Sequence, residues 1–255
     1  MSANTTLDPN LFGDSPARDE RFTVKERWVE CRNFPDGHPE KVAEFLHRQM
    51  NEEINGMEMA ARGVSDFPDA DWKIRMCIAR QCSDEARHVL MFRRLCEKLG
   101  GWVGKYPVLN FQYRIVSKID NLNGRLAVQN RSFEAGGIDA MSSGIQDHRN
   151  RGEWELVDLF EAQLADEIQH VHFANEWVRD VIQKDARNAL RIARALTDAS
   201  KAFIQVMGEA GTSEIKYVVD PVGRSEAGFE QTEVNVATAA LNSRRSASRK
   251  SQQNE

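Results

Sequence analysis

The sequence predicts an all-α fold, with four helices in a bundle and a fifth helix after them. Apolar residues recur at the helical spacing of about 3.6 residues from about residue 39 to residue 208. No run of alternating β-branched residues interrupts this pattern, and short connections between the periodic segments alternate with a long one. The 255 residues are 41% hydrophobic and 29% charged, which is typical of a globular chain that buries its own core.

The apolar spacing places the five helices at about 39–64, 71–98, 120–146, 152–183 and 185–208. The Phe-Pro-Asp sequence at 67–69 ends the first helix, and Asp69 or Asp71 can cap the second. Gly100 and Gly101 end the second helix. An irregular connection then leads to the third.

Two glycines, Gly136 and Gly137, lie inside the third predicted helix. Each costs about 1 kcal/mol relative to alanine in a helix interior. The pair indicates either a π-bulge or kink of the kind found at functional sites, or close helix packing or an earlier helix end. The sequence leaves these alternatives open.

The connections predict the topology. A few residues join the first helix to the second and the third to the fourth, so each pair forms an antiparallel hairpin. About 20 residues separate the second helix from the third, enough for a crossover along the bundle. Two hairpins with one long crossover between helices 2 and 3 are the ferritin-like arrangement.

The two ends of the chain differ from its middle. We expect residues 1–20 to be a flexible lead, 21–210 to form the bundle, and 211–255 to be largely disordered, because the last stretch is rich in Ser, Arg and Gln. The basic sequence SRRSASRK in this tail is typical of a solvated segment, although its positive charge would also allow it to contact RNA.

Charge and composition exclude several classes of protein. The net charge of −5 makes nucleic acid an unexpected partner. No apolar run approaches the roughly 20 residues of a membrane span, and the N-terminal residues lack an apolar signal core, so we expect no membrane partner and a cytoplasmic protein. The four cysteines form no Cys-x-x-Cys pair, which disfavours a zinc knuckle or redox dithiol.

The chemistry-bearing feature is a repeated Asp-Glu-x-x-His motif. It occurs at 84–88 in the second predicted helix and at 166–170 in the fourth. Residues i and i+3 lie on one helix face, so Glu85 with His88, and Glu167 with His170, can each chelate a metal ion. Two copies, each on the second helix of a hairpin, are far stronger evidence than one.

Each motif has a partner carboxylate on the preceding helix. Glu53 lies 32 residues before Glu85 (85 − 53), and Glu134 lies 33 residues before Glu167 (167 − 134). Antiparallel hairpins with these separations bring each pair to the same height. Glu58 is the alternative to Glu53 on the first helix.

All four glutamates interrupt core-facing apolar stripes that carry no Lys or Arg near them. Buried carboxylates are costly unless they are paired, and two divalent cations would balance four of them. Oxygen and imidazole ligands favour two iron ions, with manganese possible at either position. We expect Asp84 to accept the other ring N–H of the ligand histidine of the opposite hairpin, and Asp166 likewise.

This pattern resembles the ferritin-like di-iron carboxylate superfamily. The sequence DEARH at 84–88 resembles the Asp-Glu-x-Arg-His motif of bacterial multicomponent monooxygenase hydroxylases. The stretch from EINGMEMAARG to CSDEARH, with FEAGGIDA and DEIQHVHFANEW, is similar to a bacterial ferritin-like family without a firmly assigned function. The resemblance covers roughly residues 22–183.

The resemblance and the six ligands imply an oxidoreductase, a di-iron oxidase or oxygenase that uses O2 to hydroxylate, N-oxygenate or desaturate a small organic substrate. No reductase module is visible, so a separate reductase or ferredoxin would supply electrons. The fifth helix is the candidate surface for a homodimer. A stored tyrosyl radical is disfavoured, because no tyrosine lies on the ligand helices. The alternatives are a ferroxidase or iron-storage protein, a tRNA-modifying di-iron hydroxylase and a metal-free structural bundle.

Overall fold

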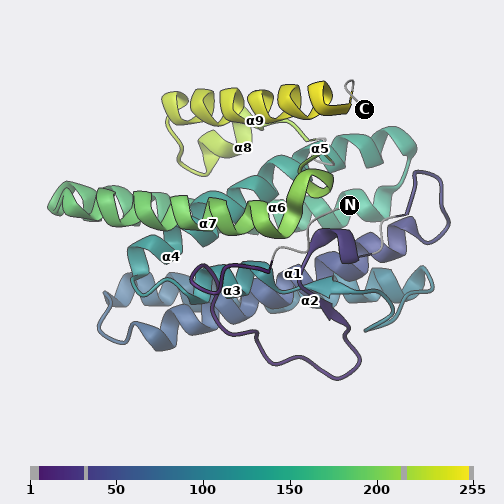
Figure 1. Ribbon diagram of the computed structural model, residues 1–255, viewed down its shortest axis with the longest axis horizontal. Helices are drawn as coiled ribbons and strands as arrows, with labels where there is room; N and C mark the ends of the chain where they lie inside the picture. Colours follow the sequence, from purple (N-terminus) through teal and green to yellow (C-terminus); the bar gives the residue numbers. More distant parts are fainter. Residues whose placement is uncertain (1–5, 32–33, 214–216, 253–255) are drawn as a thin grey trace.

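The computed structural model describes residues 6–31, 34–213 and 217–252, with side chains except at 209, 210, 212, 213 and 244–252. The described chain is mostly helical, with almost no strand, which confirms the all-α prediction (Figure 1). Its α-helices are α1 (Lys41–Asp66), α2 (Trp72–Lys98), α3 (Phe111–Ser117), α4 (Leu122–Val128), α5 (Ala135–Arg151), α6 (Trp154–Lys184), α7 (Arg187–Ser213), α8 (Pro221–Glu226) and α9 (Gln231–Gln252). Two two-residue strands, β1 (Val24–Lys25) and β2 (Val108–Leu109), pair in parallel.

Two helical hairpins form the centre of the molecule. Helix α1 packs along α2, α5 packs along α6, and α2 meets α6 between the hairpins. The side chain of Asp71 accepts a hydrogen bond from the backbone N–H of Lys73, so Asp71 caps α2. Gly152, with φ of 71°, adopts the left-handed conformation that ends α5. The crossover between the hairpins contains β2 and α3.

The third predicted helix is continuous but not uniform. Helix α4 passes into η2, a π-helical segment at Gln129–Glu134, and then into α5. The wider π turn lies directly before Gly136 and Gly137, so of the two interpretations of this region the π-bulge is the one observed. Helix α7 extends the fifth predicted helix and is kinked at Gly208.

The N-terminal lead lies against the bundle, which corrects the expectation of flexibility for residues 6–20. Phe12 is buried in an apolar cluster with Ile115 of α3 and Val206 of α7. Arg18 forms an ion pair with Glu58 of α1 at 2.6 Å. A few apolar anchors and one buried cation therefore dock a segment whose average composition is polar.

The C-terminal segment also departs from the expected disorder. Helix α8 packs on α5 and α6, and α9 packs on α7 and α8 (Figure 1). Asp139 of α5 is 1% exposed and accepts two hydrogen bonds from Arg224 of α8, while Val234 of α9 is buried. Of the basic sequence SRRSASRK, only Ser243 has a described side chain. No helix in the described ranges combines the length and apolarity needed to cross a membrane.

Candidate metal centre

The six predicted metal-ligand residues come together inside the bundle. Their side chains come from α1 (Glu53), α2 (Glu85 and His88), the end of η2 (Glu134) and α6 (Glu167 and His170). All are buried except Glu134, which is half-buried. The i, i+3 spacing places each Glu and His of a motif on the same inward face of its helix.

These residues form two overlapping groups. One ligand atom from each of Glu53, Glu85, His88 and Glu167 lies within 4.8 Å of the others, and the same holds for Glu85, Glu134, Glu167 and His170. Glu85 and Glu167 belong to both groups. The arrangement therefore offers two adjacent cation positions, each with one imidazole and one carboxylate of its own and two carboxylates in common.

Both imidazoles are oriented by the opposite hairpin. The Nδ1 atom of His88 lies 3.2 Å from a carboxylate oxygen of Glu53 and 3.2 Å from one of Glu85. Its Nε2 atom lies 3.1 Å from Asp166 Oδ2. In the other half, Nε2 of His170 lies 3.3 Å from Asp84 Oδ2. Asp84 and Asp166 thus lie where the sequence predicts them, each beside the histidine of the other hairpin.

Arg87 contacts both aspartates, on the side of the imidazoles away from the four glutamates. Its guanidinium donates to Asp166 and lies 3.5 Å from Asp84. The Arg87 side chain is 48% exposed, whereas both aspartates are 17% exposed. The arginine of the Asp-Glu-x-Arg-His motif therefore holds together the two carboxylates that orient the imidazoles.

Without cations the centre retains protons. Burial raises the pKa of Glu53 and Glu134 well above the ordinary carboxyl value, and neighbouring carboxylates raise both further. Burial opposes the charge of His88, but hydrogen bonds to Glu53 and Glu85 raise its pKa to about 11. Burial likewise opposes the charge of His170, and Asp84 with Glu167 raises its pKa well above the ordinary value. Protonated imidazoles thus balance part of the negative charge of the carboxylate cluster.

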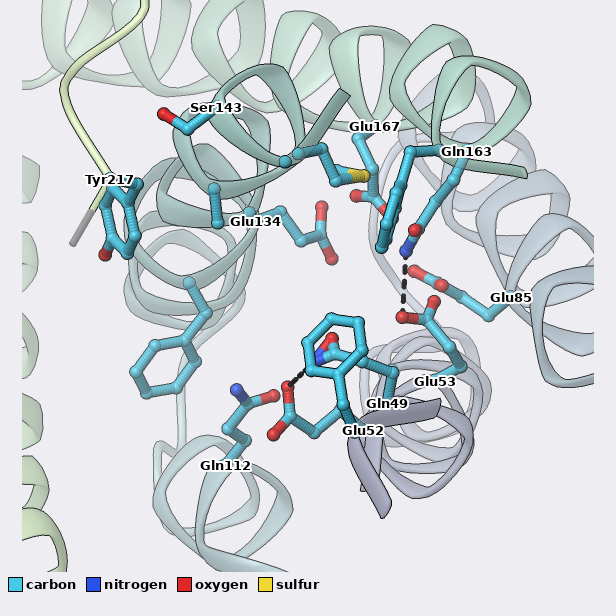
Figure 2. Close-up of a pocket in the computed structure, with 18 of the residues that line it drawn as sticks. Gln49, Glu52, Glu53, Glu85, Gln112, Glu134, Ser143, Gln163, Glu167 and Tyr217 are labelled. Atoms are coloured by element: carbon cyan, nitrogen blue, oxygen red, sulfur yellow. Dashed lines mark hydrogen bonds between the residues drawn. The ribbon is translucent and has the colours of Figure 1, made fainter. Parts of the chain in front are cut away.

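Two glutamines complete the centre and were missed by the sequence analysis. Gln81 of α2 donates to Glu134, and Gln163 of α6 donates to Glu53 at 2.8 Å (Figure 2). Each glutamine lies four residues before the motif glutamate on its own helix and reaches a carboxylate of the other hairpin. The repeat is therefore Gln-x-x-Asp-Glu-x-x-His, and a search one helical turn before each motif would have found it.

A glycine makes room for the shared carboxylate of Glu85. A Cβ atom placed on Gly56 of α1 would lie 3.1 Å from Cδ of Glu85. This distance is shorter than an ordinary van der Waals contact, so any larger residue would displace the carboxylate. Gly56 lies three residues after Glu53, on the same face of α1.

The other Glu and His residues considered as ligands do not join the cluster. Glu58 pairs with Arg18, so Glu53 is the glutamate that α1 contributes to the cluster. Glu52 pairs with Arg48 at 3.6 Å. His172 is 42% exposed and contacts the backbone oxygen of Glu226. His47 is buried and accepts a hydrogen bond from the backbone N–H of Gly104 instead.

A cavity of about 390 Å³ opens on one side of the cluster (Figure 2). The carboxylates of Glu53, Glu85, Glu134 and Glu167 form its inner end. Its apolar wall consists of Phe45, Met59, Phe133, Ala140, Met141 and Phe160. Gly137 also lines the cavity. Tyr217 of the C-terminal segment lines it as well, although this residue is not on any of the ligand helices. This volume is in the range of pockets for small organic ligands.

Comparisons with known proteins define the family but not the activity. Residues 2–235 match the family described as protein of unknown function (DUF455). An uncharacterized protein of Haemophilus influenzae is 31% identical over 111 residues, which cover 44% of this chain and 35% of that protein. No solved structure matches the chain.

Proposed function

The chain belongs to the DUF455 family, and we propose that it is an oxygen-activating di-iron oxidase or oxygenase with a ferritin-like bundle. The observation that carries the proposal is the sharing of Glu85 and Glu167 by two four-residue groups of potential ligands. Glu85 and Glu167, which belong to both groups, would each be available to both cations. Four glutamates and two histidines match the donor set of di-iron carboxylate bundles.

The donor set fits iron, with manganese as the alternative. Carboxylate and imidazole ligands suit either metal, and the cluster contains no thiolate that would favour a structural zinc site. The buried polar atoms of the cluster are consistent with a cation: Glu167 Oε2 and His170 Nδ1 make no hydrogen bond among the described residues and face each other at 3.4 Å. Both atoms face the cluster, where a cation would satisfy them.

The protein residues have separable tasks. When bound, the two iron ions would supply the electrons and coordination positions for reduction of O2. Asp84 and Asp166 hold the ligand imidazoles in one orientation, while Gln81 and Gln163 hold the carboxylates of Glu134 and Glu53. The apolar wall would contact the body of a small organic substrate. A separate redox protein would deliver electrons.

The first experiment measures metal uptake and oxygen reactivity together. Protein purified without air is loaded with Fe(II), the bound iron is counted, and the sample is mixed with O2 while its absorbance is followed from milliseconds to seconds. Two irons per chain and a transient visible absorbance are expected. Continued oxidation of many irons per chain would favour a ferroxidase or storage protein. Failure to bind two ions would contradict a dinuclear site.

A further inference from the structure

The two halves of the metal centre are related by a pseudo-twofold repeat. Gln81, Asp84, Glu85 and His88 on α2 correspond to Gln163, Asp166, Glu167 and His170 on α6. Glu53 on α1 corresponds to Glu134 on η2. The residue four positions before each of these last glutamates lies one helical turn away on the same side, and it is Gln49 in α1 but Asn130 in η2.

The symmetry is broken at this last pair. Asn130 Nδ2 lies 3.0 Å from Gln81 Oε1 and 2.9 Å from Glu134 Oε2, so both groups are fixed. Gln49 turns away and donates to Glu52 at 2.9 Å (Figure 2). Gln163, a residue that is 5% exposed, therefore has no hydrogen-bond partner for Oε1 among the described residues, whereas Gln81 Oε1 accepts from Asn130; Asn130 Oδ1 is itself unpartnered. A buried unpartnered carbonyl costs about 1–3 kcal/mol, which a bound donor group would recover.

Of the two glutamines of the centre, the one with the unpartnered carbonyl lines the cavity. Gln49, Glu52 and Gln163 line the cavity, whereas Gln81 and Asn130 do not. Figure 2 shows Gln163 directed toward Glu53 and Glu85 at the inner end of the space. An unsatisfied acceptor therefore lies where a ligand would approach the metal centre.

The charge of the cavity wall points to a basic ligand. No Lys or Arg is among the described residues that line it. Two divalent cations would balance the four ligand carboxylates, which leaves Glu52 and the exposed Asp147 as further acidic lining groups. The basic side chains nearest the wall already have carboxylate partners. Arg48, outside the cavity, pairs with both Glu44 and Glu52, and Nδ1 of His148 lies 2.6 Å from Glu153.

We propose that the cavity binds an amine with an apolar body, whose N–H group donates to Gln163 Oε1 while Glu52 attracts its positive charge. This inference rests on the proposed function, since it places the amine beside the two metal ions. The apolar body would lie against the wall formed by Phe45, Phe160 and Met141. An acid of the same shape would meet carboxylates without a compensating cation on the wall.

The test is calorimetric and needs no oxygen chemistry. Full-length protein loaded with redox-inert Zn(II) is titrated with 2-phenylethylamine and hexylamine, and with the similarly sized 2-phenylethanol and 3-phenylpropionate. An amine is expected to bind at least about tenfold more tightly than the alcohol or the acid, the usual effect of one charged hydrogen bond. Equal binding of all probes, tighter binding of the acid, or binding of neither amine would overturn the inference.

Control variants are matched by residue type and by helix. Gln163→Met removes an amide that lines the cavity, whereas Gln169→Met removes one from the exposed side of the same helix, α6. Glu52→Gln and Glu58→Gln each remove one carboxylate from α1, and only Glu52 lines the cavity. The amine preference is expected to fall about tenfold in Gln163→Met and Glu52→Gln and to persist in their counterparts. Equal losses in both members of each pair would contradict the assignment.

Metal content is measured on the same samples. A chain that binds no metal contradicts the proposed function and this inference with it. A chain that binds two ions and shows no preference for amines contradicts only the inference. The two failures are therefore distinguishable.

Discussion

The carboxylate of Asp166 lies 3.1 Å from Nε2 of His88, although the two residues belong to different hairpins. The reciprocal contact joins Asp84 to His170 at 3.3 Å. Each hairpin thus orients the imidazole of the other, so neither half of the centre is complete until the hairpins have packed together. The pair also fixes which ring nitrogen faces the carboxylate cluster.

Replacing either aspartate should weaken metal binding without removing a ligand. Asp166→Ala is expected to lower metal affinity by about 10–100-fold, because the imidazole loses the group that fixes its orientation. Competition with a chelator of known affinity measures the change. Asp158→Ala, on the exposed side of α6, is the matched control and should bind as tightly as the unmodified chain. An equal effect of both substitutions would contradict an orienting role for Asp166.

Two nearby glutamates of α1 should have different effects. Glu53→Ala is expected to remove one of the two metal ions, because it deletes the carboxylate that belongs to one group alone. Glu58→Ala should retain both ions, since Glu58 instead pairs with Arg18 of the N-terminal segment. Metal analysis of both purified variants makes the comparison. Loss of metal in Glu58→Ala alone would reverse the assignment.

Metal uptake should release protons and strengthen as the pH rises. Burial raises the pKa of Glu53 and Glu134, and His170 has a raised pKa despite its burial because carboxylates surround it. Because their pKa values are raised, these groups retain protons to a higher pH than an ordinary carboxyl or imidazole group does, and a cation must displace those protons. Acidification therefore weakens binding. Calorimetry in buffers of different ionisation enthalpy measures the protons released, and a heat independent of the buffer would exclude this coupling.

The buried histidine His47 should make the stability of the fold depend on pH. Burial lowers the pKa of His47 to about 4, from an unfolded value near 6.5. Between these values the unfolded chain binds the proton and the folded chain does not, so this residue destabilises the fold as the pH falls through the window. The free energy of unfolding of His47→Gln should lose less between pH 6.5 and pH 4 than that of the unmodified chain. Parallel pH profiles would show that His47 is not the cause.

The N-terminal lead should contribute to the core. Phe12→Ala is expected to destabilise the fold by about 3–5 kcal/mol, since it empties a buried aromatic site between α3 and α7. Val29 is 72% exposed, and Val29→Ala should change stability by less than about 0.5 kcal/mol. Urea unfolding gives both values. A Phe12→Ala variant as stable as the control would mean that the lead contributes nothing to the core.

The C-terminal segment should be held by one buried ion pair. Asp139 accepts hydrogen bonds from the Arg224 side chain and from the backbone N–H of Asp220. Removing one partner of such a pair costs about 3–5 kcal/mol, so Asp139→Ala should expose the segment around 217–230 to proteases. Glu161→Ala breaks only an exposed pair with Arg149 and is the control. Equal cleavage of both variants would exclude the anchoring role.

The metal-ligand candidates were predictable because their geometry is local. An i, i+3 pair lies on one helix face whatever surrounds it, and a hairpin with a short turn relates the heights of two helices by residue count alone. Glu53, Glu85, Glu134 and Glu167 could therefore be matched by their separations, and the aspartate beside each motif glutamate could be assigned to the opposite histidine. The choice between Glu53 and Glu58 depended on Arg18, whose position no helical spacing specifies.

The remaining features depend on contacts between distant parts of the chain. Composition predicted disorder for both ends, but Phe12 packs between α3 and α7, and Arg224 meets a buried carboxylate of α5. Tyr217 reaches the cavity although it lies outside the ligand helices. The free carbonyl of Gln163 follows from the different directions taken by Gln49 and Asn130. Helical periodicity records which face of a helix is buried, whereas the partner of a buried group is chosen only when the segments pack in three dimensions.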